Sequence, residues 1–117
     1  MKTILKSLCL VATIFLMSNC VTAQKSVQTV VIQTTIACDH CKVCPTCGGL
    51  LEKTLIKHKG IQMITLDEKK ATITVIYNSK KTTLPAIKTA ISKLGYDADD
   101  VKADPVGYQS LDGCCKA

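Results

Sequence analysis

The sequence predicts a small α+β domain. Three segments alternate apolar and polar residues with the two-residue period of a β-strand, and two others repeat apolar residues with the period of an α-helix. They follow one another in the order strand, helix, strand, strand, helix. Two helices on one face of an antiparallel sheet form the split βαβ, or ferredoxin-like, arrangement, and a short strand over residues 96–101 would complete it as βαββαβ.

The predicted first strand and first helix flank a cysteine-rich segment. Residues 27–36 alternate as a strand does, and from residue 50 to 58 the pattern becomes helical. Gly60, which readily adopts the left-handed conformation, is expected to end this helix. His58 falls near the helix end at helical spacing from the apolar residues, so we expect it to be partly buried. The apolar residues of this face are Leu51 and Leu55.

A hairpin and a second helix follow. Strands are predicted over residues 61–66 and 71–77, and the polar residues between them are typical of a hairpin connection. In the second of these strands alternate residues should face the core, with Thr72 among those facing out. Thr83 is the candidate N-cap of the second helix, and Gly95 is expected to end it. The inward residues of the second strand are Ala71, Ile73, Val75 and Tyr77.

The first 23 residues are predicted to be a secretory signal peptide. A lysine-containing start precedes an apolar run that is too short to span a bilayer, and small residues precede the expected cleavage site. A lipoprotein acylated at Cys20 is the alternative. We therefore expect an exported protein, periplasmic or secreted, with one domain over residues 24–103 and a C-terminal tail over residues 104–117.

The composition excludes several classes of function. The chain is basic, with a formal net charge of +6, but it has no Trp and a single Phe, so it lacks the aromatic platforms on which nucleic acids stack. Neither a Ser–His–Asp set nor a glycine-rich phosphate loop is visible. We expect no nucleic-acid partner, no small-molecule substrate and no enzymatic activity.

Residues 38–47, called here the cysteine loop, carry cysteines at intervals of three. Thiolates are soft ligands, suited to Cu(I), Zn or iron–sulfur clusters. A helix that begins near Cys47 would direct its unpaired N–H groups at the nearest sulfurs and lower their pKa. Cysteines three apart diverge on a helix, so all four converge only in a loop, which Pro45 and the following glycines favour. The candidate metal ligands are Cys38, Cys41, Cys44 and Cys47.

Three further residues are weaker candidate ligands. His40 lies inside the cysteine loop, where an exposed polar residue without a ligand role is the alternative. Cys114 and Cys115 form a pair in the tail. The tail either returns to the cysteine loop with extra ligands or carries an incidental disulfide partner, and in an exported chain the pairing of the cysteines stays open.

Several features of the sequence, taken in their order along the chain, resemble the heavy-metal-associated domain family. This family includes copper chaperones, the metal-binding modules of copper-pumping ATPases and periplasmic mercury-scavenging proteins. The matching features cover roughly residues 27–100. The features are a strand, a Cys-x-x-Cys motif at the head of a helix, Lys59-Gly60-Ile61, the hairpin Leu66-Asp67-Glu68-Lys69, Tyr77-Asn78, and Leu94-Gly95-Tyr96-Asp97-Ala98.

The resemblance implies a monomeric carrier. Such a protein holds a soft metal ion through two thiolates on an exposed loop and passes it by ligand exchange to a metal-transporting membrane protein or to another metal-binding domain. Copper(I) is the first expectation for the cargo, with Hg(II) and Zn as alternatives.

Two alignments compete for the family's cysteine pair. Counted back from Gly60, Cys47 falls where the family has its second cysteine, which makes Cys44 the first. Counted forward from the strand, Ile36-Ala37-Cys38 fits the family's Met-x-Cys, which makes Cys38 and Cys41 the pair. A loop expanded by six residues accommodates both alignments. We predict Cys44 and Cys47 as the primary ligands, supplemented by Cys38 and Cys41.

Two other chemistries suit the cysteines. The Cys44-Pro-Thr-Cys47 motif at a helix start is typical of thiol–disulfide oxidoreductases. The order of the following elements and the lack of an aromatic residue before the motif argue against that interpretation. Iron–sulfur ferredoxins also use cysteines separated by two other residues, but their fourth cysteine follows three intervening residues and precedes proline. In this chain the proline follows Cys44 instead.

Overall fold

The structure is a computed structural model that describes residues 25–38, 40 and 43–116. The signal peptide predicted over residues 1–23 and the candidate ligand Cys41 lie outside the described residues. None of the described helices is both long and apolar enough to cross a membrane. The elements are β1 (Val27–Gln33), α2 (Gly48–Leu55), β2 (Ile61–Asp67), β3 (Thr72–Asn78), α3 (Leu84–Lys93), α4 (Pro105–Gln109) and the 3₁₀ helix η2 (Gly113–Cys115).

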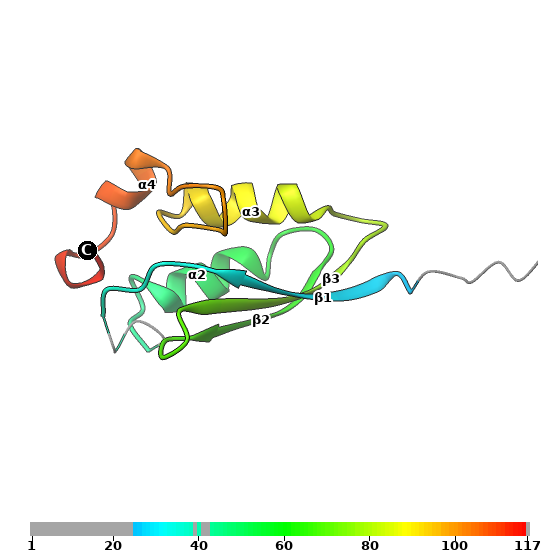
Figure 1. Ribbon diagram of the computed structural model, residues 1–117, viewed down its shortest axis with the longest axis horizontal. Helices are drawn as coiled ribbons and strands as arrows, with labels where there is room; N and C mark the ends of the chain where they lie inside the picture. Colours follow the sequence, from blue (N-terminus) through cyan, green and yellow to red (C-terminus); the bar gives the residue numbers. More distant parts are fainter. Residues whose placement is uncertain (1–24, 39, 41–42, 117) are drawn as a thin grey trace, which may run out of the picture.

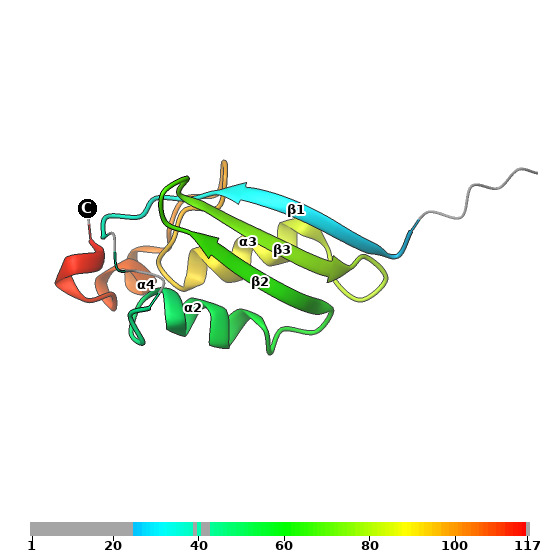
Figure 2. The same cartoon turned by 90° about the horizontal axis from the view of Figure 1, so that it is seen from below.

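The strands form one antiparallel sheet in the order β1-β3-β2. Val75 of the central strand pairs with Val30 on one side and Ile64 on the other, and the register of β2 shifts by one residue between Ile61 and Met63. Helices α2 and α3 cover the same face of the sheet, as the two views in Figures 1 and 2 show. The predicted α+β, ferredoxin-like class is confirmed.

The core lies between this face of the sheet and the two helices. Ile73 and Val75 of β3 are fully buried, and they belong to one cluster with Leu51 of α2 and Ile87 of α3. Complete burial of such a side chain stabilises the fold by about 1.5–3 kcal/mol. Ile73, Val75 and Tyr77 are buried as predicted, whereas Ala71, predicted to face the core, is half-buried in the turn before β3.

Two side chains lie differently from their predictions. Thr72 was expected to face outward but is only 7% exposed, because on the central strand it is flanked by Gln33 on one side and Asp67 on the other. His58 was expected to be partly buried but is exposed. Helix α2 ends at Leu55, so His58 falls in the turn that follows the helix and not on its apolar face.

The first strand is shorter than predicted because its partner ends. β1 stops at Gln33, and beyond it a single ladder-like hydrogen bond joins Thr34 N to Ala71 O at 2.9 Å. Ala71 has a φ of 51° and belongs to the turn before β3, so none of the described strands pairs with residues 35–38. They are free to lead into the cysteine loop.

The short last strand predicted over residues 96–101 is absent from the described chain, and a tight turn takes its place. The backbones of Ala98 and Val101 bond to each other in both directions, and Asp99 between them has a φ of 53°. Asp tolerates this left-handed conformation better than most residues. The turn docks on the end of β1, where Gln33 N donates to the Asp99 carboxylate at 2.7 Å and Gln33 O accepts from Asp99 N at 2.8 Å.

The C-terminal segment, residues 104–116, packs against the rest of the molecule. Asp104 caps α4 by accepting a hydrogen bond from Gly107 N at 3.1 Å, and its own N–H donates to Ser92 O of α3 at 2.9 Å. A Cβ atom on Gly107 would lie 2.3 Å from Lys93 O, so only glycine allows this approach to α3. Leu111 is 7% exposed and belongs to the core.

Candidate metal centre

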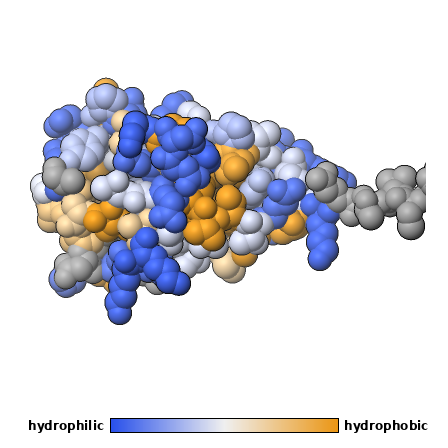
Figure 3. Space-filling view, viewed as in Figure 1, coloured by the Kyte–Doolittle hydropathy of each residue, from blue (hydrophilic) through white to orange (hydrophobic). Residues whose placement is uncertain are grey.

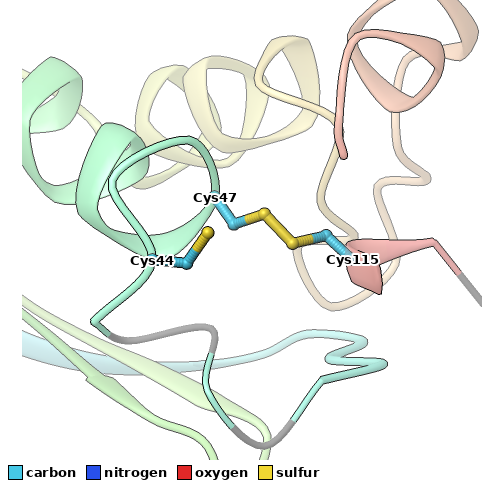
Figure 4. Close-up of side chains that lie close together, drawn as sticks. All are labelled: Cys44, Cys47 and Cys115. Carbon is cyan, nitrogen blue, oxygen red and sulfur yellow. A yellow bond between two sulfur atoms is a disulfide. The ribbon is translucent and has the colours of Figure 1, made fainter. Parts of the chain in front are cut away.

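The described residues 43–47 of the cysteine loop and the C-terminal segment meet at one end of the molecule, beside the start of α2 (Figure 1). The sulfur atoms of Cys44, Cys47 and Cys115 all lie within 4.8 Å of one another. Cys47 and Cys115 are joined by a disulfide across 68 residues, with their Cα atoms 6.6 Å apart. Figure 4 shows Cys44 next to this disulfide. The fold therefore brings three sulfurs together from two distant parts of the chain.

Hydrogen bonds of the backbone hold Cys44 and Cys47 at the helix start. Cys44 O accepts from Cys47 N at 3.3 Å and from Gly49 N at 2.9 Å, and Cys47 O accepts from Leu51 N at 3.0 Å. A Cβ atom on Gly49 would lie 2.9 Å from Cys44 O, so the glycine permits the close turn. Cys47 is the N-cap residue of α2 and its side chain makes no capping bond, which leaves its sulfur for other chemistry.

The surroundings of Cys44 favour its ionised form. The Thr46 hydroxyl lies 3.2 Å from Cys44 Sγ and lowers the pKa of the thiol most, and the backbone N–H groups of Thr46 and Cys47 lower that pKa further. Partial burial and the Asp112 carboxylate act in the opposite direction. The Thr46 hydroxyl also forms a short hydrogen bond with the Asp112 carboxylate, which connects the cysteine loop to the C-terminal segment. Because a hydroxyl has one proton, it donates to Asp112 or to the Cys44 thiolate, and not to both at once.

The thiol of Cys114 is affected in the opposite sense. Partial loss of solvent raises the pKa of Cys114 most, and the charges of Cys38, Cys44 and Asp112 raise it further. These groups are close enough to interact electrostatically, so negative charge accumulates at this end of the molecule as the thiols ionise. A bound cation would relieve that repulsion.

Replacing Thr46 with valine should raise the pKa of Cys44, because the substitution removes the hydroxyl that stabilises the thiolate. The rate of alkylation by iodoacetamide, measured at Cys44 by peptide mass spectrometry, should then reach its half-maximal value at a higher pH than in the unmodified chain. Thr54→Val, on an exposed position of α2, is the matched control and should leave the pH profile unchanged. Identical profiles for Thr46→Val and the wild type would show that the hydroxyl does not set the reactivity of Cys44.

The predicted ligands divide into three groups. Cys44 and Cys47, predicted as the primary ligands, lie close together, and Cys115, a weaker candidate, joins them. Cys38 is half-buried and accepts a hydrogen bond from His40 N at 3.3 Å, but its sulfur is not part of the three-sulfur group. The two remaining described candidates, His40 and Cys114, are exposed.

Thr46 and Asp112 were not predicted as parts of the site. Their hydrogen bond joins residues 66 positions apart. A threonine between two cysteines and an aspartate before a glycine are each typical of loops, so no local pattern indicates that they meet. Only the docking of the C-terminal segment brings them together.

The sulfur geometry is compatible with a soft cation once the disulfide is open. A metal–sulfur bond of about 2.3 Å separates thiolates by about 3.8 Å in a tetrahedral site and about 4.0 Å in a trigonal one. Cys44 Sγ lies within 4.8 Å of both disulfide sulfurs, so shifts of about 1 Å or less would bring it to such spacings. Cys47 and Cys115 would have to move apart after reduction. In their disulfide they are not available as thiolate ligands.

The fold and the thiol cluster define a small α+β domain with soft ligands at the start of a helix. Residues 43–97 match the sequence model of the heavy-metal-associated domain, the family that the sequence features resemble. The match includes Cys44 and Cys47 and begins after Cys38. A comparison with curated proteins finds no match. Together, the domain family and the cysteine cluster support binding of a heavy metal ion.

Solved structures with a similar fold include metal-binding proteins. A CopZ metallochaperone superposes with a TM-score of 0.51 at 22% identity, over 61% of this chain and 98% of that one. Oxidised MerP from Ralstonia metallidurans CH34 gives 0.52 at 19% identity, over 62% and 94% of the two chains. A copper form of a CopA variant from Bacillus subtilis gives 0.50 at 26% identity, over 62% and 90%.

Proposed function

We propose that the chain is an exported carrier that, when reduced, binds one soft metal ion through Cys44 and Cys47 and passes it on by ligand exchange. The observation that carries this proposal is the convergence of the Cys44, Cys47 and Cys115 sulfurs within 4.8 Å at the start of α2. Copper(I) is the first choice of cargo, because thiolates prefer it and because CopZ and CopA are among the similar structures. Hg(II) and Zn are the alternatives, and MerP supports the former.

Metal binding in this proposal requires the Cys47–Cys115 disulfide to be reduced. Reduction adds two electrons and two protons to the two sulfurs, and a dithiol such as dithiothreitol supplies them as it closes into its own cyclic disulfide. Export through the signal peptide over residues 1–23 would place the chain in the periplasm or outside the cell, where disulfides form and persist, so a thiol reductant has to open the pair before metal binds. Acylation at Cys20 would instead tether it to a membrane.

Transfer requires a partner to approach the thiols. Exposed apolar side chains surround the site, with Val43 on the cysteine loop 77% exposed and Val106 on α4 75% exposed. Thr46, Leu50 and Val106 line one shallow pocket between α2 and α4. Figure 3 shows an apolar area beside polar residues at this end of the molecule.

These features suit docking of a metal-transporting membrane protein or another metal-binding domain. The exposed Lys53 and Lys57 would steer an acidic surface toward the site. The chain acts in this proposal as a monomer and not as an enzyme.

Native mass spectrometry of the reduced protein tests this function. Protein purified from cells expressing the full-length chain is reduced with dithiothreitol, freed of reductant under nitrogen and offered Cu(I), Zn or Hg(II). We expect one bound ion per chain, with the tightest binding for Cu(I). The double variant Cys44→Ser/Cys47→Ser should lose this ion, whereas Cys38→Ser/Cys41→Ser should retain it. Unchanged stoichiometry and affinity in the first variant would refute the assignment.

A second function is favoured by one observation. The Cys44 thiol, with its lowered pKa, lies within 4.8 Å of the disulfide sulfurs of Cys47 and Cys115. Attack of the Cys44 thiolate on Cys47 Sγ would form a Cys44–Cys47 disulfide and release Cys115 as a thiolate, as in a thiol–disulfide oxidoreductase. Turnover in an insulin-reduction assay that depends on Cys44 would support this function over metal transport.

A further inference from the structure

We infer that Cys115 is the third ligand of the metal site, which two separate segments of the chain therefore build. The inference rests on the proposed function and adds the ligand that the pair at the start of α2 lacks. Its starting point is geometric. Cys115 Sγ already reaches the other two sulfurs, since it is bonded to Cys47 and lies within 4.8 Å of Cys44.

The C-terminal segment is held in place by contacts other than the disulfide. Leu111 is buried in the core, and Gly107 contacts the backbone of α3 so closely that a Cβ atom there would clash. Asp112 accepts hydrogen bonds from the Thr46 hydroxyl and, through its backbone oxygen, from Cys115 N at 2.9 Å. When the disulfide is reduced, these contacts keep Cys115 beside the cysteine loop.

The reduced Cys115 side chain has room to adjust. A pocket of about 180 Å³ lies next to it and is lined by Tyr108 and Leu111 of the same segment and by Thr35 after β1. Two thiolates that bind one ion must separate from disulfide distance to about 4 Å. Because Cys115 itself lines the pocket, the pocket offers free space beside its side chain for this separation.

The neighbouring cysteines do not fit the same role. Cys114 is exposed, and its sulfur lies 3.8 Å from that of Cys115 without belonging to the three-sulfur group. Cys38 is half-buried in the loop, but its sulfur also lies outside the group. Both are matched controls for Cys115, because each is a thiol at the same end of the molecule.

A third thiolate changes how the carrier holds its cargo. With Cu(I), two thiolates give a complex of charge −1, whereas three give −2 and saturate a trigonal site. An incoming partner thiolate must then displace Cys115 and not simply add to a two-coordinate ion. Oxidation of Cys47 with Cys115 removes two of the three ligands together, so the disulfide form and the metal-bound form exclude each other.

X-ray absorption at the copper edge tests the inference by counting sulfur neighbours of Cu(I) bound to the reduced protein. We expect three sulfurs in the wild type, three in Cys114→Ser and Cys38→Ser, and two in Cys115→Ser. Competition with a chromogenic Cu(I) chelator should show at least about a tenfold loss of affinity in Cys115→Ser, since loss of even an outer-shell partner costs a metal site that much. Circular dichroism of each reduced variant checks that it is folded.

The outcomes separate the inference from the function on which it rests. If Cu(I) has only two sulfur neighbours in the wild type, the assignment of Cys115 as a third ligand is overturned. Copper binding and the proposed function would still stand. Three neighbours retained in Cys115→Ser also overturn this assignment, whatever the count in Cys38→Ser or Cys114→Ser. Absence of Cu(I) binding to the reduced wild type overturns the proposed function itself.

Discussion

Reduction of the Cys47–Cys115 disulfide is expected to lower the free energy of unfolding by about 4 kcal/mol. The bond joins residues 68 positions apart. The loop-entropy model assigns about 3 kcal/mol to a closed loop of about 15 residues and about 4.7 kcal/mol to one of about 100 residues, so this loop falls between them. Small domains have a total stability of about 5–15 kcal/mol, so the reduced protein should remain folded with a much smaller margin. Guanidinium titrations with and without dithiothreitol measure the difference.

Two variants make this result specific. Cys115→Ser should match the reduced wild type and should not respond to dithiothreitol, because its cross-link is absent. Cys114→Ser should behave as the wild type in both states, because Cys114 is a free thiol. Coincident unfolding curves for the oxidised and reduced wild type would mean that the disulfide constrains a segment that is already held fully by other contacts.

Replacing Gly107 with alanine is expected to destabilise the protein by about 2–3 kcal/mol, at the upper end of what an extra methyl group costs in a tightly packed position. The added Cβ atom would lie 2.3 Å from Lys93 O and 2.7 Å from Gly95 N, and both are backbone atoms that cannot rotate away. Helix α4 would have to move off α3. Thermal unfolding of the reduced proteins measures the loss.

The same substitution should also weaken the Cys47–Cys115 disulfide, because α4 positions the turn that carries Cys115. In a glutathione redox buffer, the fraction of protein with this bond should fall relative to the wild type. Gly113→Ala is the matched control, since a Cβ atom there meets nothing within 4 Å. That variant should change stability by no more than about 0.5 kcal/mol. Equal disulfide fractions in both variants would contradict the positioning role of α4.

The regular elements were predictable because periodicity reports burial. Ile73 and Val75 alternate as a buried strand requires, and Thr83 caps α3 through its side chain as its position suggested. The predicted last strand failed because the Asp99-Asp100 sequence favours a turn over a ladder, and Asp99 adopts the left-handed conformation there. In both cases the residues of the segment itself determined its conformation.

The site was only partly predictable because it depends on a contact over a long stretch of sequence. The spacing of Cys44 and Cys47, followed by glycines, indicated the start of α2. Nothing in the sequence around Cys115 indicated whether the C-terminal segment returns, since that depends on Gly107 meeting α3 and on Leu111 entering the core. Such contacts arise from packing, which no local pattern encodes.

The start of β1 and the thiol cluster lie at opposite ends of the molecule (Figures 1 and 2), which has a practical consequence for experiments. β1 begins at the end of the molecule away from the thiols, whereas η2 carries Cys115 within the thiol cluster (Figures 1 and 2). An affinity label or a surface linkage placed ahead of β1 should leave the sulfurs open to solution. The same group fused directly behind Cys115 would crowd them, and a histidine label in that position would add competing imidazoles to every measurement of metal uptake.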